Sequence, residues 1–125
     1  MNNKNITQKK DLFKKDSTIT IHNLNSSKVK EKINIGVIVL THNSQKHIKK
    51  CLDALILDTK KLNDTLYITI HLVDNFSQDE TVNITGRYQL KTRVNRENIG
   101  FSKAINFILK STDYDYYILL NPDTE

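Results

Sequence analysis

The residues of this sequence best suited to chemistry are two carboxylates and a set of amides that follow four short apolar runs. Asp74 ends one run, and Asp123 comes shortly after another. An ionised carboxylate only accepts hydrogen bonds, so it can bind an N–H donor of a ligand or hold a hard divalent cation. The polar clusters that end the four runs are Thr41-His42-Asn43, Asp74-Asn75, Asn95 to Asn98, and Asn121-Pro122-Asp123.

The chain lacks the glycine-rich loops that commonly bind phosphate. Neither GxGxxG nor the P-loop pattern GxxxxGK(S/T) occurs, and the only glycines are Gly36, Gly86 and Gly100. Phosphate charge would therefore have to be neutralised by a metal ion and its carboxylates, for which Asp123 is the natural candidate. The four histidines and the single cysteine, Cys51, give no zinc signature and no intrachain disulfide, which indicates a reducing, cytosolic setting.

The elements that must position these residues alternate between strands and helices. Residues 35–40 (IGVIVL) form a continuous β-branched apolar run, as expected of a strand buried on both faces of a parallel sheet. The other predicted strands and the two main helical stripes are at 66–73, 92–94, 116–120, 48–56 and 101–109. This pattern predicts an α/β fold with a doubly wound, mostly parallel sheet, whose strands end at one shared edge. The four polar clusters would then form one site.

Charge divides the chain into two parts. Residues 1–32 hold eight lysines against three acidic residues, and the remaining 93 residues carry no net charge. Residues 1–32 therefore predict a Lys/Asn-rich, disordered leader with at most one weak strand near Ile19–Leu24, and 33–125 predict the folded domain. A folded part without excess positive charge argues against a nucleic-acid partner.

No apolar run approaches the roughly 20 residues needed to span a bilayer. Contact with a membrane would therefore be peripheral, and the lysine-rich leader leaves contact with anionic lipid open. The expected location is the cytoplasm, with the inner face of the membrane as the site of any such contact.

Four ordered segments together resemble glycosyltransferase family 2, which has the GT-A fold, over about residues 34–125. Each segment follows a predicted strand end: VIVLTHNSQKHIKKCLDAL, LVDNFSQDET, NRENIGFSKAIN and ILLNPDTE. Within the family, the sequence looks most like bacterial rhamnosyltransferases and related makers of surface polysaccharide. The resemblance implies a hexosyltransferase-type enzyme that uses a UDP- or dTDP-sugar donor and a saccharide or lipid-linked acceptor.

The resemblance also implies roles for individual residues. Thr41 and His42, with Asn43 beside them, would border the pyrimidine, and Asp74 would accept a hydrogen bond from its ring N–H. Asn121-Pro122-Asp123 matches the DxD motif, so Asn121 would face the nucleotide and Asp123 would ligate Mg²⁺ or Mn²⁺ at the diphosphate. The loop and helix start beside the nucleoside and its phosphates would be formed by Asn98, Gly100, Phe101, Ala104 and Asn106.

The sequence departs from the family pattern at two points. Asn121 replaces the first aspartate of the DxD motif, which leaves one carboxylate there. The family continues well beyond this point with an acceptor pocket and, in inverting members, a catalytic Asp or Glu general base. The base is therefore expected beyond Glu125. We expect the chain to be part of a longer enzyme, a GT-A sheet cut after about four strands, without transferase activity by itself.

Other interpretations remain open at this stage. A nucleotidyltransferase would show a glycine-rich loop with a basic residue after the first strand, which THNSQKH matches poorly. A non-catalytic flavodoxin-like module would bind neither UDP nor dTDP. Asp74 is also suited to capping a short helix that opens at Ser77 to Asp79, as Asn43 or Ser44 is to capping the preceding helix. Asp123 is equally suited to a turn after Pro122.

Overall fold

The computed structural model describes residues 31–124 of the 125-residue chain, so the predicted leader, apart from its last two residues, lies outside the described residues. The elements in chain order are β1 (Ile33–Thr41), α2 (Ile48–Lys61), β2 (Leu66–Asp74), α3 (Thr81–Thr85), β3 (Lys91–Val94), α4 (Phe101–Ser111) and β4 (Tyr116–Leu120). No helix in this described range is long and apolar enough to cross a membrane.

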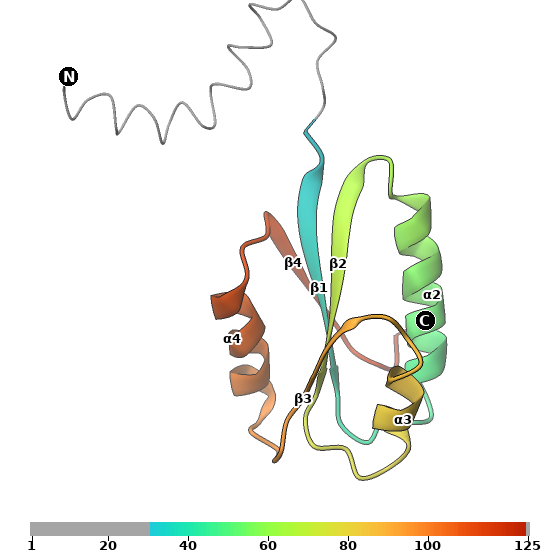
Figure 1. Cartoon of the computed structure of the whole chain (residues 1–125), viewed down its shortest axis with the longest axis vertical. Coiled ribbons are helices and arrows are strands. Elements are labelled where there is room, and N and C mark those ends of the chain that lie inside the picture. The colour runs from blue at the N-terminus through green and yellow to red at the C-terminus, as the bar shows by residue number, and fades with distance from the viewer. Residues whose placement is uncertain (1–30, 125) are drawn as a thin grey trace, which may run out of the picture. The chain divides into compact units, whose positions relative to one another are not determined.

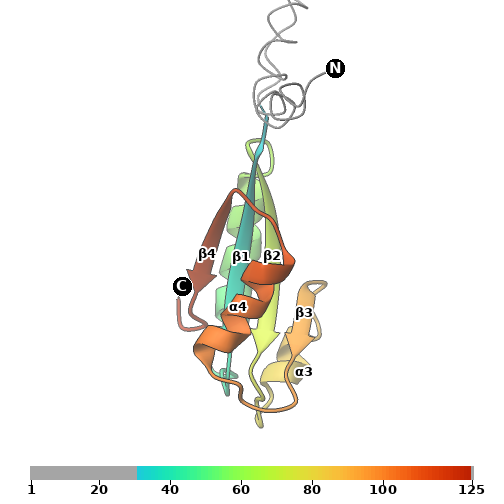
Figure 2. The same cartoon turned by 90° about the vertical axis from the view of Figure 1, so that its left-hand side faces the viewer.

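The four strands form one parallel sheet in the order β3-β2-β1-β4. Helices α2 and α3 lie on one face of the sheet and α4 lies on the other (Figures 1 and 2). The sequence-based expectation of an α/β fold with a mostly parallel sheet of about four strands is confirmed. All strands therefore end at one edge, where their carboxyl ends carry the polar clusters.

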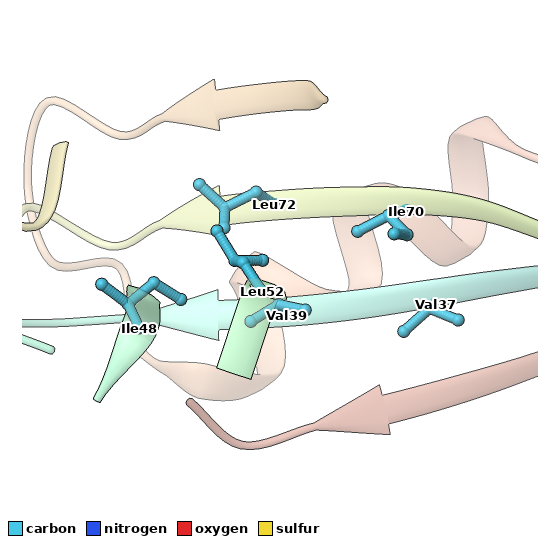
Figure 3. Packing of buried hydrophobic residues seen from close by; sticks show 6 residues of the cluster. All are labelled: Val37, Val39, Ile48, Leu52, Ile70 and Leu72. Carbon is cyan, nitrogen blue, oxygen red and sulfur yellow. The ribbon is translucent and has the colours of Figure 1, made fainter. Parts of the chain in front are cut away.

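The two faces of β1 are buried against different helices. Val37 and Val39 pack against α2, in a cluster whose other buried members are Ile48, Leu52, Ile70 and Leu72 (Figure 3). Ile38 points to the opposite face and packs with Val73 and with Ala104, Ile105 and Ile108 of α4. Successive side chains of a strand point to opposite faces of the sheet. A strand that is buried on both faces therefore has apolar residues at successive positions.

The predicted helix caps differ from the structure. Helix α2 begins at Ile48, and its N-cap, His47, makes no side-chain capping bond, so capping by Asn43 or Ser44 is wrong. The backbone of Ser44 instead closes a turn, since its carbonyl accepts hydrogen bonds from His47 N and Ile48 N. The side chain of Asn43 is used elsewhere, because its Oδ1 accepts a hydrogen bond from Gln78 N at 2.8 Å.

The second helix starts later than predicted. Helix α3 begins at Thr81, whose backbone N–H donates to the Asp79 carboxylate at 3.0 Å. Residues 77–79, predicted to open this helix, form the loop that precedes it. The carboxylate and hydroxyl side chains ahead of α3 satisfy backbone donors that have no partner within a helix.

The two outer strands of the sheet have different surfaces. β3 is short and carries Lys91 and Arg93, whereas β4 is apolar. On β4, Tyr116, Ile118 and Leu119 are 61%, 45% and 50% exposed. Charged side chains protect a strand edge from pairing with other strands, and β4 has none.

Candidate functional site

An open pocket of about 500 Å³ lies at the carboxyl edge of the sheet. Among the residues assigned from sequence, Thr41, His42, Asn98, Gly100 and Phe101 line it. The remaining lining residues are Leu40, Ser44, Asn75 and Pro122. The other assigned residues, Asn43, Asp74, Ala104, Asn106, Asn121 and Asp123, do not line this pocket. The pocket thus joins the ends of β1 and β2 to the start of α4.

Asp74 lies beneath the pocket and has no exposed surface. Its Oδ1 accepts hydrogen bonds from Thr41 Oγ1 at 2.8 Å and Ser77 Oγ at 2.6 Å, and its Oδ2 accepts one from Ser77 N at 2.9 Å. The carboxylate therefore holds the loop that follows β2; it caps no helix, because α3 begins only at Thr81. A ligand N–H would reach it only after Ser77 moved away.

The loops after β1 and β2 hold each other through side chains. Asn43 N donates to Ser77 Oγ at 2.8 Å, and Ser44 N donates to Thr81 Oγ1 at 2.7 Å. Asn43 adopts φ = +50°, a left-handed conformation that asparagine tolerates better than most residues. Asn43 does not line the pocket, because its backbone N–H and its side-chain amide both form hydrogen bonds that hold the two loops together.

The orientation of the His42 ring is fixed from both of its nitrogens. Nδ1 lies 2.9 Å from Asn75 O, which can only accept, so Nδ1 carries the proton. Nε2 lies 3.4 Å from Asn43 Nδ2, a donor. A proton on Nδ1 with Nε2 as acceptor satisfies both contacts, so the imidazole is an oriented wall of the pocket.

Helix α4 begins at the pocket. Its N-cap, Gly100, has φ = +83°, a conformation that residues with a Cβ rarely adopt, and the first side chain of the helix, Phe101, is 55% exposed. The first N–H groups of a helix lack intrahelical partners and favour an anion. Ala104 is fully buried in the core and Asn106 lies on the exposed side of α4. The helix therefore faces the pocket with its first residues and not with Ala104 or Asn106.

Within the part of the chain that the structure describes, two hydrogen bonds hold the segment after β4. Asn121 O accepts hydrogen bonds from Thr124 N at 3.1 Å and from the Cys51 thiol at 3.7 Å. Asp123 is exposed. Burial raises the pKa of the Cys51 thiol, and the nearby negative charge of Asp123 raises that pKa further. Asp123 therefore lies close to the start of α2, beside the pocket wall formed by Pro122.

A protein-only metal centre is not present in the described range, since no three His, Cys, Asp or Glu side chains come together there. Asp123 supplies one exposed carboxylate, and Asn121 adds an amide oxygen two residues earlier. Mg²⁺ and Mn²⁺ favour oxygen ligands, and Mg²⁺ is commonly held by one or two carboxylates plus substrate phosphates and water. The residues present fit an ion of this kind that shares its ligands with a diphosphate.

Several residues that build the site were not assigned to it from the sequence. Asn75 and Asn95 were recognised only as members of strand-end clusters, yet they are 4% and 5% exposed and their side chains bond to each other at 3.2 Å. Ser44, Ser77 and Thr81 organise the loops. A buried polar side chain needs a partner, but no pattern in the sequence identifies a partner that lies 20 to 37 residues away.

One comparison with known proteins identifies a family. The family model described as Glycosyl transferase family 2 matches residues 36–125. None of the curated proteins matches the chain.

Two solved glycosyltransferases have similar folds. A mannosyltransferase from Pyrobaculum calidifontis, in complex with GDP-Man and Mn²⁺, has a TM-score of 0.64 and 23% identity, over 74% of this chain and 28% of that one. S. aureus TarS 1-349 in complex with UDP has a TM-score of 0.60 and 27% identity, over 73% of this chain and 28% of that one. TarS has also been solved with UDP-GlcNAc. The chain thus spans about 28% of the length of these structures.

Proposed function

This chain belongs to glycosyl transferase family 2, and on that premise we propose that its pocket binds the nucleotide of a UDP- or dTDP-sugar donor. The observation that carries the proposal is the open pocket of about 500 Å³, in which the ends of β1 and β2 meet the start of α4. The oriented His42 imidazole, the side-chain amide of Asn98 and the start of α4 suit a ligand with a flat ring and phosphate oxygens.

The phosphate end of the donor would extend toward the segment after β4. Strands β2 and β4 both flank β1, so their ends are separated by two strand spacings, about 10 Å. That distance is about the length of a nucleoside monophosphate. A nucleoside seated near the end of β2 would therefore place its diphosphate near Asp123.

Asp123, with Asn121, would hold Mg²⁺ or Mn²⁺ at the diphosphate. The ion supplies positive charge that stabilises the diphosphate as it leaves. The chain's own part is to orient the nucleoside between the β1 loop and α4, and to direct one carboxylate toward the ion. An exposed Asp123 retains the freedom to turn toward an ion that arrives with the donor.

Transfer would be of a hexosyl group to a saccharide or lipid-linked acceptor in surface polysaccharide synthesis, as in rhamnosyltransferase-like members. The proposed location is the cytoplasm, at the inner face of the membrane, where the eight lysines of residues 1–32 would favour anionic lipid. The general base would lie in the part of the longer structures that this chain does not span. We therefore expect no detectable sugar transfer by the isolated chain, and robust turnover would refute this.

Calorimetric titration of the full chain with UDP and dTDP, with and without Mn²⁺, tests the nucleotide site. We expect measurable binding that Mn²⁺ strengthens. Asp123→Ala should remove only the metal-dependent gain, roughly 1 to 3 kcal/mol, the scale of a charged polar interaction. Asp64→Ala, at an exposed carboxylate in the turn before β2, is the matched control and should bind as the unaltered chain does. Absence of affinity under both conditions would favour the non-catalytic module.

A further inference from the structure

Three asparagines form a hydrogen-bonded network at the pocket, and two of them, Asn75 and Asn98, line it. Asn75 Oδ1 accepts hydrogen bonds from Asn95 Nδ2 at 3.2 Å and from Ile99 N at 3.0 Å. Asn75 Nδ2 donates to Asn98 Oδ1 at 2.8 Å. Asn98 Oδ1 also accepts from Gly100 N at 3.0 Å. Through these side chains, the end of β2 is tied to the end of β3 and to the start of α4.

The side-chain amide of each of these three asparagines is held in one orientation by an N–H group, which can donate a hydrogen bond but cannot accept one. Ile99 N–H requires an oxygen, so Asn75 must present Oδ1 to it and turn Nδ2 toward Asn98. In the same way, Gly100 N–H requires the oxygen of Asn98. The Arg93 Nε–H group fixes Asn95, because it donates to Asn95 Oδ1 at 2.9 Å. The directions of the three amides are therefore determined together.

The consequence falls on the pocket side of Asn98. Its Oδ1 accepts two hydrogen bonds, which uses both lone pairs of that oxygen. Its Nδ2 has no partner within residues 31–124, and the residue lines the pocket. We propose that Asn75 is a positioning residue that locks the Asn98 amide with Nδ2 outward, as a donor to an oxygen of the bound nucleotide. This inference rests on the proposed nucleotide site.

Asn75 orients the pocket through its backbone as well as through its side chain. Its backbone carbonyl also receives the His42 Nδ1–H, so one residue orients two walls of the pocket. In Asn75→Asp, one carboxylate oxygen would face Asn98 Oδ1, and two acceptors repel each other. Asn98 would then reverse its amide, turning Oδ1 outward and leaving Gly100 N–H without an acceptor. The pocket would present an acceptor where the unaltered chain presents a donor.

Nuclear magnetic resonance of the ¹⁵N-labelled full chain tests the inference directly. We expect the Asn98 side-chain NH₂ signals to shift on saturation with UDP. Uridine and inorganic pyrophosphate, titrated separately, distinguish a nucleoside oxygen from a phosphate oxygen, since the probe that supplies the acceptor reproduces the shift. Backbone shifts in residues 41–44 with unmoved Asn98 NH₂ signals would overturn the inference alone. No shift anywhere would overturn the proposed nucleotide site as well.

Two substitutions give an independent measurement. Asn98→Asp keeps an oxygen for Asn75 Nδ2 and Gly100 N but replaces the outward donor with an acceptor, so the chain should fold normally and bind UDP about tenfold more weakly or worse. Asn75→Asp should weaken UDP binding similarly, with the Asn98 NH₂ signals no longer shifting. Asn63→Asp, an exposed asparagine before β2, controls for the added charge and should bind normally. UDP affinity in Asn98→Asp within twofold of the control would overturn the assignment.

Discussion

The two sides of the pocket differ in how many hydrogen bonds hold them within residues 31–124. Many hydrogen bonds join the loops after β1 and β2 on one side, whereas few hold the segment after β4 on the other. Residues 41–44 and 74–81 exchange hydrogen bonds through Asp74, Ser77 and Thr81. Among residues 31–124, the hydrogen bonds of 121–124 are the backbone bond of Thr124 and the contact with the Cys51 thiol. The first side is preorganised, and preorganised groups bind a ligand without an ordering cost. The second side would acquire its order from an ion and a diphosphate.

The largest expected effect comes from removing the centre of the preorganised side. Asp74→Ala would leave the half-buried Ser77 N–H and hydroxyl without their acceptor, and the buried Thr41 Oγ1 with only Val73 O at 3.4 Å. We expect the free energy of unfolding, measured with urea, to fall by about 3 kcal/mol, because orphaned buried polar groups cost about 1 to 3 kcal/mol. UDP binding would weaken with and without Mn²⁺, as a consequence of the disordered loop.

Asp123→Ala is the matched substitution on the other side, and its unfolding free energy should stay within about 0.5 kcal/mol of the unaltered chain. A comparable loss of stability in both variants would contradict the difference between the two sides. So would an Asp74→Ala chain that keeps its stability and loses only nucleotide affinity, because Asp74 would then act on the ligand directly.

A smaller effect is expected at the rim of the preorganised side. Asp79 accepts hydrogen bonds from Thr81 N, Thr81 Oγ1 and Gln45 N, and Asp79→Ala should cost about 1 kcal/mol, as for the loss of a helix cap. Partial burial raises the pKa of Asp79, but the hydrogen bonds from Thr81 and Gln45 outweigh it, so the pKa lies below its usual 3.8.

This direction fixes the pH dependence of that contribution. A carboxylate whose pKa is lowered by folding stabilises the protein above its unfolded-state pKa and loses that effect as pH falls through the folded-state value. The stability difference between Asp79→Ala and the unaltered chain should therefore be full at neutral pH and shrink below pH 3.8. Urea unfolding at pH 7 and at about pH 2.5 measures it. A difference that persists unchanged in acid would show that the charge of Asp79 is not involved.

The smallest expected effect is a change in the titration of Cys51, which reports on the loosely held side. Burial, and then the charge of Asp123, raise the pKa of this thiol. Asp123→Asn should lower that pKa, and so should Mn²⁺ bound together with UDP, because each removes or offsets the negative charge. Cys51 is the only cysteine, so its ¹³Cβ resonance can be followed against pH without ambiguity. An unchanged pKa in Asp123→Asn would place Asp123 away from the pocket wall.

The sequence predicted the frame of the site more accurately than its contacts. The apolar run at 35–40 and the polar clusters after each run were enough to predict a parallel sheet whose strands end at one edge, and this sheet is confirmed. From the sequence, Asp74 was expected to face the ligand and Asn75 was assigned no role, because the order of two polar residues at one strand end does not show which side chain is covered. In the structure, Asp74 is sealed beneath the loop and Asn75 lines the pocket.

The amino-acid sequence by itself determined the order of strands and helices, the edge at which polar groups gather and the family, because these depend on periodicity and on motifs read along the chain. The tertiary structure decided which polar atoms face a ligand. Asn98 presents its Nδ2 to the pocket because Gly100 and Asn75 occupy its oxygen, and Asn75 is in turn oriented by Ile99. A hydrogen bond is directional and needs both partners in place, so its direction is defined only after the chain has folded.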